Sequence, residues 1–317
     1  MKAALASPGN SCIPRPSRRE RRAARSWAAR IPATDPGGGG LLQQGTLADQ
    51  QWLYRFGLGL TALTLPIFPF GGSTQIDYEN DLKFAFGNIR YKFPETPFSA
   101  GPRFIYRSSD ISLQSQAPLA DRVDGIIAGF TGGHQYVALG LSLNYDTQDN
   151  PFTPLRGMNA VLKHDRYSPA FGSDREFSET QLNVHAFQPI GGKWSVGAKL
   201  GIDSVTDDAP FFMAPGVDLR GVEYGRYQGG TALSVEAELR HQFTPRWAGV
   251  AFGGYGRTYA DNSRLFESQR DIWTYGAGIR YRIARKYGID LGLDVARGPE
   301  STVFYIQFGH AWARSMD

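Results

Sequence analysis

The 317-residue chain holds 38 glycines and 13% aromatic residues, and this composition favours an all-β fold over a helical one. No apolar run reaches the roughly 18 residues of a spanning helix, so helical membrane spans are excluded. The first 30 residues carry eight basic side chains against one acidic side chain, which leaves a net charge of −3 for the rest. The overall charge of +4 therefore gives no indication of a nucleic-acid-binding surface on the folded part.

Residues 1–48 are expected to form a disordered basic and glycine-rich tail. The run Gly37–Gly40 has the composition of a flexible junction, and the apolar stretch of a signal peptide is missing. Cys12, the single cysteine, also lies here, so the remainder has no cysteine for a disulfide or a metal site. We interpret residues 1–48 as a non-native start, with an organelle transit peptide as the alternative, and residues 49–317 as the folded domain.

From Trp52 onward, segments of about ten residues alternate apolar and polar side chains, and turn residues separate them. Successive side chains of a strand point to opposite faces, so each segment has one apolar and one polar surface. In Val137–Asp146 the residues Val137, Leu139, Leu141, Leu143 and Tyr145 share the apolar face. About twelve strands are predicted, at residues 51–62, 80–93, 100–113, 136–146, 157–168, 176–189, 193–205, 226–242, 246–260, 271–285, 287–297 and 301–313.

A soluble β-sandwich shows the same alternation, so segment length and aromatic placement must distinguish the two folds. Several segments reach ten residues or more, the length that crosses a bilayer at a tilt, and strands of soluble folds average about five or six. Tryptophan and tyrosine lie toward the segment ends, as in interfacial girdles. We therefore predict an antiparallel transmembrane β-barrel in contact with outer-membrane lipid.

The stretch GLSLNYDTQDNPFTPLRG (Gly140–Gly157) resembles the strand, the DTRDNP turn and the following glycine of the bacterial surface antigen domain. This domain is the C-terminal barrel of the BamA/TamA superfamily. In this chain, the aspartate and asparagine side chains of the turn are expected to bind backbone amides and so fix the turn, and the glycine that follows suits a sharp bend. The residues of this turn motif are Asp146, Asp149, Asn150, Pro151 and Gly157.

The stretch LRGVEYGRYQGGTALSVEAELR (Leu219–Arg240) resembles the RG loop and the following ELR strand of that family. The resemblance implies that the loop folds into the lumen, where Glu238 on the inner wall holds Arg220, with Gly221 after it. A guanidinium in a confined polar lumen needs a carboxylate partner. Without the resemblance, a solvated surface arginine is the ordinary interpretation.

This sequence departs from the family pattern at two positions of the expected clasp. Val222 replaces the aromatic residue after RG, and Gly254 replaces the acid of the F-x-D-x-G strand. Glu236 lies on the same face as Glu238 and is the candidate substitute for the missing acid.

The last strand carries Phe304, Ile306, Phe308, His310 and Trp312 on one face, which resembles the signal that barrel-assembly machinery recognises. The family barrel has sixteen strands, five of them after the RG loop as here. A count of about twelve implies that this chain is the C-terminal part of such a barrel, without POTRA domains.

The resemblance implies a bacterial outer-membrane protein that inserts or translocates other proteins, with barrel-assembly machinery and client outer-membrane proteins as partners. An unpaired edge would template the client strand, at a seam between the segment near Trp52 and the one ending at Trp312. A passive pore, a structural barrel and a truncated non-functional fragment are the alternatives. The five histidines are scattered and G-x-S-x-G is missing, so we expect no enzyme activity, cofactor, metal or nucleic-acid partner.

Overall fold

The computed structural model describes residues 27–31, 38–69, 75–113, 123, 128–206, 208–223, 225–259, 265–266 and 271–312, the first five by their backbone alone. The strands in these ranges are β1 (Trp27–Ile31), β2 (Gly38–Leu47), β3 (Trp52–Ile67), β4 (Ile76–Lys92), β5 (Phe98–Leu113), β6 (Gly132–Asp146), β7 (Gly157–Tyr167), β8 (Phe177–Gly191), β9 (Trp194–Val205), β10 (Thr231–Gln242), β11 (Trp247–Tyr259), β12 (Asp271–Ala284), β13 (Ile289–Arg297) and β14 (Thr302–Phe308). Three short 3-10 helices accompany them: η3 (Ala128–Phe130), η4 (Pro169–Phe171) and η5 (Phe211–Met213).

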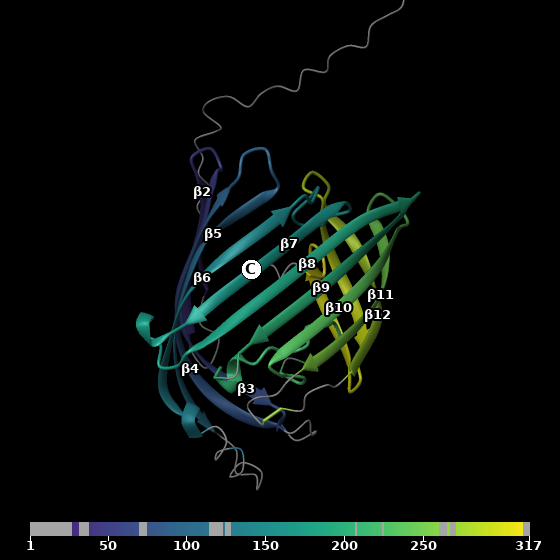
Figure 1. The fold of residues 1–317 in the computed structure, drawn as a ribbon. Coiled ribbons are helices and arrows are strands. Elements are labelled where there is room, and N and C mark those ends of the chain that lie inside the picture. The colour runs from purple at the N-terminus through teal and green to yellow at the C-terminus, as the bar shows by residue number, and fades with distance from the viewer. Residues whose placement is uncertain are drawn as a thin grey trace, which may run out of the picture.

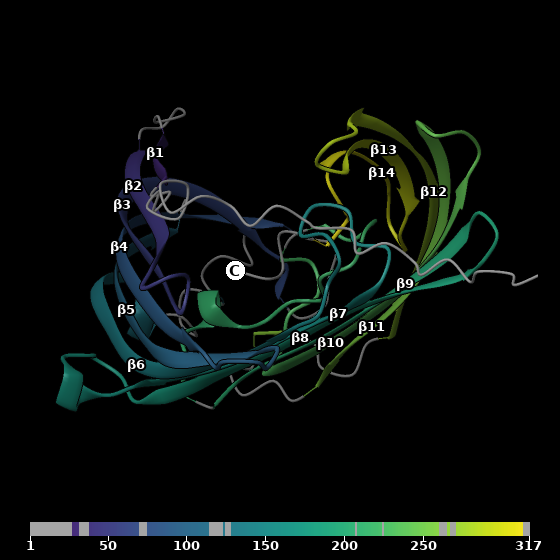
Figure 2. The same ribbon diagram turned by 90° about the horizontal axis from the view of Figure 1, so that it is seen from above.

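All fourteen strands belong to one antiparallel sheet, and each strand pairs with its neighbours in chain order (Figure 1). The sheet curves around an interior, and its first and last strands lie apart when it is seen from above (Figure 2). Among the described strands, no ladder joins β1 to β14. The fold is an all-β antiparallel sheet with barrel curvature, left unclosed between its first and last described strands.

Strands β3 to β14 correspond to the twelve predicted strands, with ends that differ by a few residues. The predicted tail is wrong in its C-terminal part, because Trp27–Ile31 pairs with β2 and Gly38–Leu47 pairs with β3. The sequence pattern did not predict β2 because of its glycines, since glycine has low β-propensity and no side chain to show alternation. A Cβ at Gly38 would lie 2.8 Å from the Leu60 carbonyl oxygen, so close strand packing requires glycine there. Residues 1–26, with Cys12, lie outside the described ranges.

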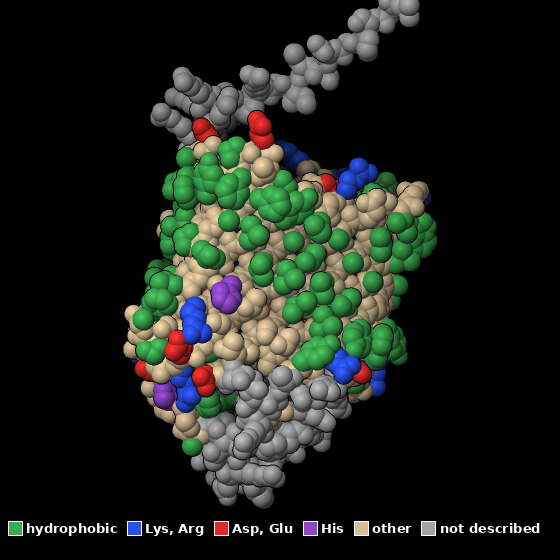
Figure 3. Space-filling model, in the orientation of Figure 1, with side chains coloured by type: hydrophobic (Ala, Val, Ile, Leu, Met, Phe, Trp, Pro, Cys, Tyr) green, Lys and Arg blue, Asp and Glu red, His purple; other side chains and the backbone are tan. Residues whose placement is uncertain are grey.

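The outer surface is largely apolar, and polar side chains line much of the inner wall, the reverse of a soluble sandwich. On β6, Leu141 is 67% exposed, whereas the alternating Ser142 and Asn144 are buried. On β14, Phe304 is 76% exposed. Apolar side chains are spread over the face shown in Figure 3, and large apolar side chains are exposed on most of the described strands. Among the described residues, no helix is long and apolar enough to cross a membrane.

Two connections pack across the interior rather than around the rim. The link between β9 and β10 brings Phe211 to 5.3 Å from the Tyr78 ring of β4, and Phe212 to 5.6 Å from the Tyr136 ring of β6. At the other end of the sheet, Asn150 Nδ2 in the β6–β7 turn donates to the Tyr287 carbonyl, 2.9 Å away, beside β13. Both connections join parts of the sheet that are far apart in strand order.

Candidate functional site: a charged clasp in the lumen

The link between β9 and β10 is tied to the inner wall just before Arg220. Lys199 of β9 donates to the Asp218 carbonyl oxygen at 2.9 Å and pairs with its carboxylate. The Asp218 backbone N–H donates to Ser234 Oγ of β10 at 2.9 Å. These contacts bring the following residue pair, Arg220-Gly221, against the wall.

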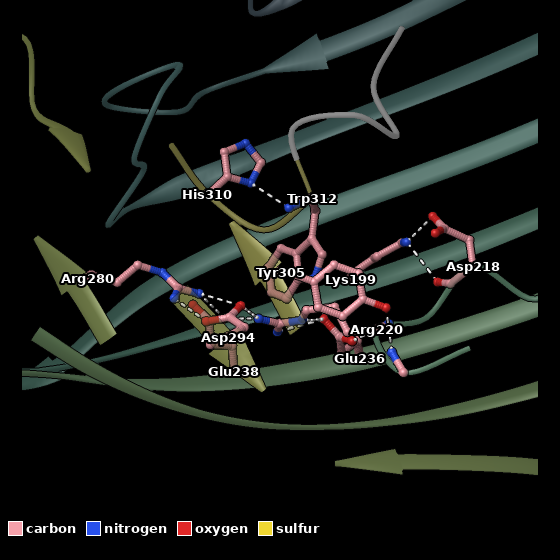
Figure 4. Close-up of polar contacts among 11 residues, drawn as sticks. Lys199, Asp218, Arg220, Glu236, Glu238, Arg280, Asp294, Tyr305, His310 and Trp312 are labelled. Carbon is pink, nitrogen blue, oxygen red and sulfur yellow. Dashed lines mark hydrogen bonds and ion pairs between the residues drawn. The ribbon is translucent and has the colours of Figure 1, made fainter. Parts of the chain in front are cut away.

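Arg220 is buried and binds three carboxylates (Figure 4). Its Nε donates to Glu236 Oε1 at 2.9 Å, and its Nη1 donates to Glu238 Oε2 and Asp294 Oδ2 at 2.8 Å each. The guanidinium carbon lies 3.4 Å from the centre of the Phe252 ring, within cation–π distance. We call Arg220, Glu236, Glu238 and Asp294 the clasp.

A second guanidinium compensates the excess negative charge of the clasp. Arg280 of β12 donates through Nη2 to Asp294 Oδ2 at 3.0 Å and lies 3.4 Å from Glu238 Oε2. Burial opposes the charge of Arg220, but Glu238 and Glu236 beside it outweigh burial and raise the pKa of the guanidinium above its ordinary value. The loop arginine therefore stays charged and is held by charge-assisted hydrogen bonds.

The structure brings together the residues that the sequence predicted for this site, Arg220, Gly221, Glu236 and Glu238. It adds the carboxylate of Asp294, which the sequence pattern did not predict. Asp294 supplies the acid that Gly254 does not, and a Cβ at Gly254 would lie 2.9 Å from Leu219 Cδ2 of the loop. The sequence did contain a signal, because the polar faces of the segments that became β12 and β13 carry opposite charges. Arg280 and Arg282 stand on one, Asp290 and Asp294 on the other.

Gly221 occupies a position where the backbone requires glycine. Its φ is +93°, and a Cβ would lie 2.9 Å from the Gly298 backbone nitrogen in the β13–β14 link. Its N–H donates to the Tyr305 hydroxyl of β14 at 2.9 Å. The RG pair of the loop thus contacts both the clasp and the last strand.

The turn motif folds through the contacts that its residue types favour. Asp149 Oδ1 accepts hydrogen bonds from two backbone N–H groups, those of Leu155 at 3.0 Å and Arg156 at 3.2 Å. Two further side-chain oxygens accept three more hydrogen bonds: Asp146 Oδ1 accepts from Gln148 N–H, and Asn150 Oδ1 accepts from Phe152 and Thr153 N–H, on either side of Pro151 in the turn. Gly157 has a φ of +97°.

The C-terminal row is shorter than the sequence predicts. Phe304, Ile306 and Phe308 point outward and are exposed, but His310 and Trp312 are buried inside. The expectation that Trp312 continues the outer row is wrong, because β14 ends at Phe308 and Gly309, with φ +85°, turns the chain inward.

A lipid-facing antiparallel sheet with a charged loop clasped in its interior defines a membrane β-barrel with an internal loop. Residues 78–312 match the model of the Omp85 superfamily domain, and the chain belongs to this superfamily. Its barrels are outer-membrane proteins, and the superfamily is known for protein insertion or translocation. This agrees with the resemblance to BamA and TamA.

Two solved structures have a similar fold. BamA from Haemophilus ducreyi lacking POTRA domains 1–3 matches with a TM-score of 0.61 and 14% identity, over 86% of this chain and 61% of that one. CdiB from Escherichia coli matches with a TM-score of 0.55 and 10% identity, over 86% and 52%. At these identities the likeness shows the fold alone, and the chain spans between half and two thirds of each structure's length. The comparison with curated proteins finds no match.

Proposed function

We propose that this chain lies in the bacterial outer membrane and promotes the insertion or translocation of proteins there, without an enzymatic step. Its partners would be barrel-assembly machinery and unfolded outer-membrane proteins. The single observation that supports the proposal is the edge of β14, which has β13 as its one neighbour among the described strands. An open strand edge presents backbone groups on which an incoming strand can pair.

The backbone groups on that edge follow from the register. Gly309 N–H donates to the Asp290 carbonyl at 2.8 Å, and Gln307 pairs with Gly292. Along an antiparallel strand, consecutive residues direct their N–H groups to opposite neighbours, so those of Phe304, Ile306 and Phe308 point to the free edge. The expected seam also changes, because the strand of Trp52 pairs with both β2 and β4, and β1 is the first described strand.

The test is reconstituted insertion. Vesicles holding the purified chain should accelerate the folding of a urea-unfolded eight-stranded barrel severalfold over empty vesicles. Ile306→Pro removes one edge N–H and should abolish the acceleration, whereas Ile306→Ala keeps this N–H and should retain it. Equal rates with empty vesicles, or with the two variants, would contradict the proposal. Steady conductance in planar bilayers without any insertion would instead favour a passive pore.

A further inference from the structure

The segment after β14 enters the lumen. At Gly309, a Cβ would lie 2.6 Å from the Phe152 carbonyl oxygen of the turn motif, so the chain passes close against that turn. His310 then lies with its ring centre 5.8 Å from that of His185 on β8. The four residues Gly309–Trp312, which we call the terminal segment, therefore pack inside the sheet.

Trp312 occupies a site formed by several strands. Its ring centre lies 5.5 Å from that of Phe187 and 5.7 Å from that of His185. A Cβ at Gly197 of β9 would lie 3.0 Å from the indole, so glycine leaves room for it. Trp312 is 4% exposed, and its Nε1 donates to Glu236 Oε1 at 2.5 Å.

Glu236 is also the clasp carboxylate that binds Arg220 most extensively. Its Oε1 lies 2.9 Å from Arg220 Nε and 2.7 Å from Nη2, and its Oε2 accepts from the Arg220 backbone N–H at 3.3 Å. One buried carboxylate thus receives the loop arginine and the terminal indole together (Figure 4). Tyr305 provides a second link between the end of the chain and the loop, through its hydroxyl and Gly221 N–H.

We propose that Trp312 is a positioning residue of the clasp, and that through Trp312 and Tyr305 the last strand and the lumen loop move together. The indole N–H fixes the orientation of Glu236, so without it the carboxylate is held less firmly in the geometry that binds Arg220. Displacement of the terminal segment loosens Arg220, and release of Arg220 frees the terminal segment. The proposal goes beyond the proposed insertion activity, because it concerns the coupling of two parts of this chain.

The test is the accessibility of the loop in a Cys12→Ser background that carries Val222→Cys as the single thiol. Val222 is partly buried against the loop's apolar cluster, so its labelling rate by a bulky maleimide in detergent or proteoliposomes reports loop release. Trp312→Phe keeps an aromatic ring but removes the N–H together with part of the ring system, and should raise the labelling rate about tenfold, as expected for loss of a hydrogen bond to a charged group. Tyr305→Phe should raise it by a smaller factor.

Phe308→Leu is the matched control, because Phe308 lies on the outer face of β14, the strand that also carries Tyr305, and its replacement should leave the rate unchanged. Unchanged labelling in both Trp312→Phe and Tyr305→Phe, with heat-modifiable migration showing folded barrels, would overturn the coupling. If Trp312→Phe fails to fold, Tyr305→Phe alone decides. The readout needs no client protein, so failure here leaves the insertion proposal standing, and an inactive insertion assay leaves the coupling standing.

Discussion

At the scale of single residues, arginine and carboxylate side chains alternate on the inner wall of β10, β12 and β13. Beyond the clasp, Asp290 accepts from Arg240 Nη2 at 2.7 Å and from Arg282 Nε at 2.6 Å. In the described part of the chain, the buried carboxylates of Asp165, Glu236, Asp290 and Asp294 each have at least one guanidinium partner, which offsets the cost of removing them from water. Arginine suits this arrangement because its rigid planar fork offers five N–H donors that can meet carboxylates on several sides, whereas lysine offers three donors on one compact ammonium.

Arg220→Lys should therefore destabilise the folded chain although the charge is kept. One ammonium cannot replace the contacts to Glu236, Glu238 and Asp294, and a buried pair broken on one side costs about 3 kcal/mol. The urea midpoint of tryptophan fluorescence in vesicles should fall accordingly. Arg285→Lys, in the exposed β12–β13 turn, is the control and should leave the midpoint in place. Equal midpoints for the two variants would show that the clasp contributes no stability.

His310 makes the seating of the terminal segment dependent on pH. Burial lowers the pKa of His310 from 6.5 to about 4, so the seated imidazole is neutral when a released one is already protonated. The packing of the terminal segment inside the sheet is most stable above pH 6.5, and its stability falls as the pH falls toward 4. Maleimide labelling of Ala311→Cys, normalised to Ser301→Cys on the exposed β13–β14 link, should rise across this window. His310→Gln should make the ratio flat, and a rise of equal size in that variant would exclude His310 as the titrating group.

At the scale of elements, twelve strands could be predicted because alternation repeats with a period of two residues, as in Val137–Asp146. β2 could not, since its glycines interrupt any such period, and β1 could not because its five residues are too few to show one. The clasp could be predicted only in part for a different reason. Glu236 and Glu238 could be identified because they alternate with apolar residues within one strand, β10. Contacts across the interior, such as those of Asp294 and Trp312, join distant segments and leave no local pattern in the sequence. Trp312 therefore looked like part of the outer row.

The β6–β7 turn depends on a backbone bend that admits only glycine. Gly157 has a positive φ, and a Cβ there would lie 2.2 Å from the Thr147 carbonyl oxygen. Gly157→Ala should lower the unfolding free energy by about 1–3 kcal/mol and loosen the Asn150 contact to Tyr287. Gly133→Ala, where nothing lies within 4 Å of the added carbon, is the matched control. Urea unfolding of both variants measures the difference, and equal midpoints would refute the strain argument.

At the scale of the whole molecule, the described sheet is open between β1 and β14, so its curvature depends on contacts across the interior. The β9–β10 link provides these at one end. Its Phe211 side chain is 1% exposed and packs against Tyr78 and Phe130 on one half, whereas Arg220 binds the wall of the other half. The link thus spans the two halves of the sheet and fixes their separation.

Phe211→Ala should consequently change the shape of the barrel as well as its stability. Truncating a buried aromatic side chain costs about 3–5 kcal/mol, and here the lost contacts are those that hold the loop to the β3–β5 half. Spin labels on the outward positions Leu60 and Leu293 should give a broader distance distribution by pulsed electron resonance in the variant than in the parent. Phe171→Ala removes an exposed aromatic ring from η4 and should leave the distribution unchanged. If the distribution stays narrow in Phe211→Ala, contacts other than this loop set the curvature, and β1 and β14 are held apart by the strands themselves.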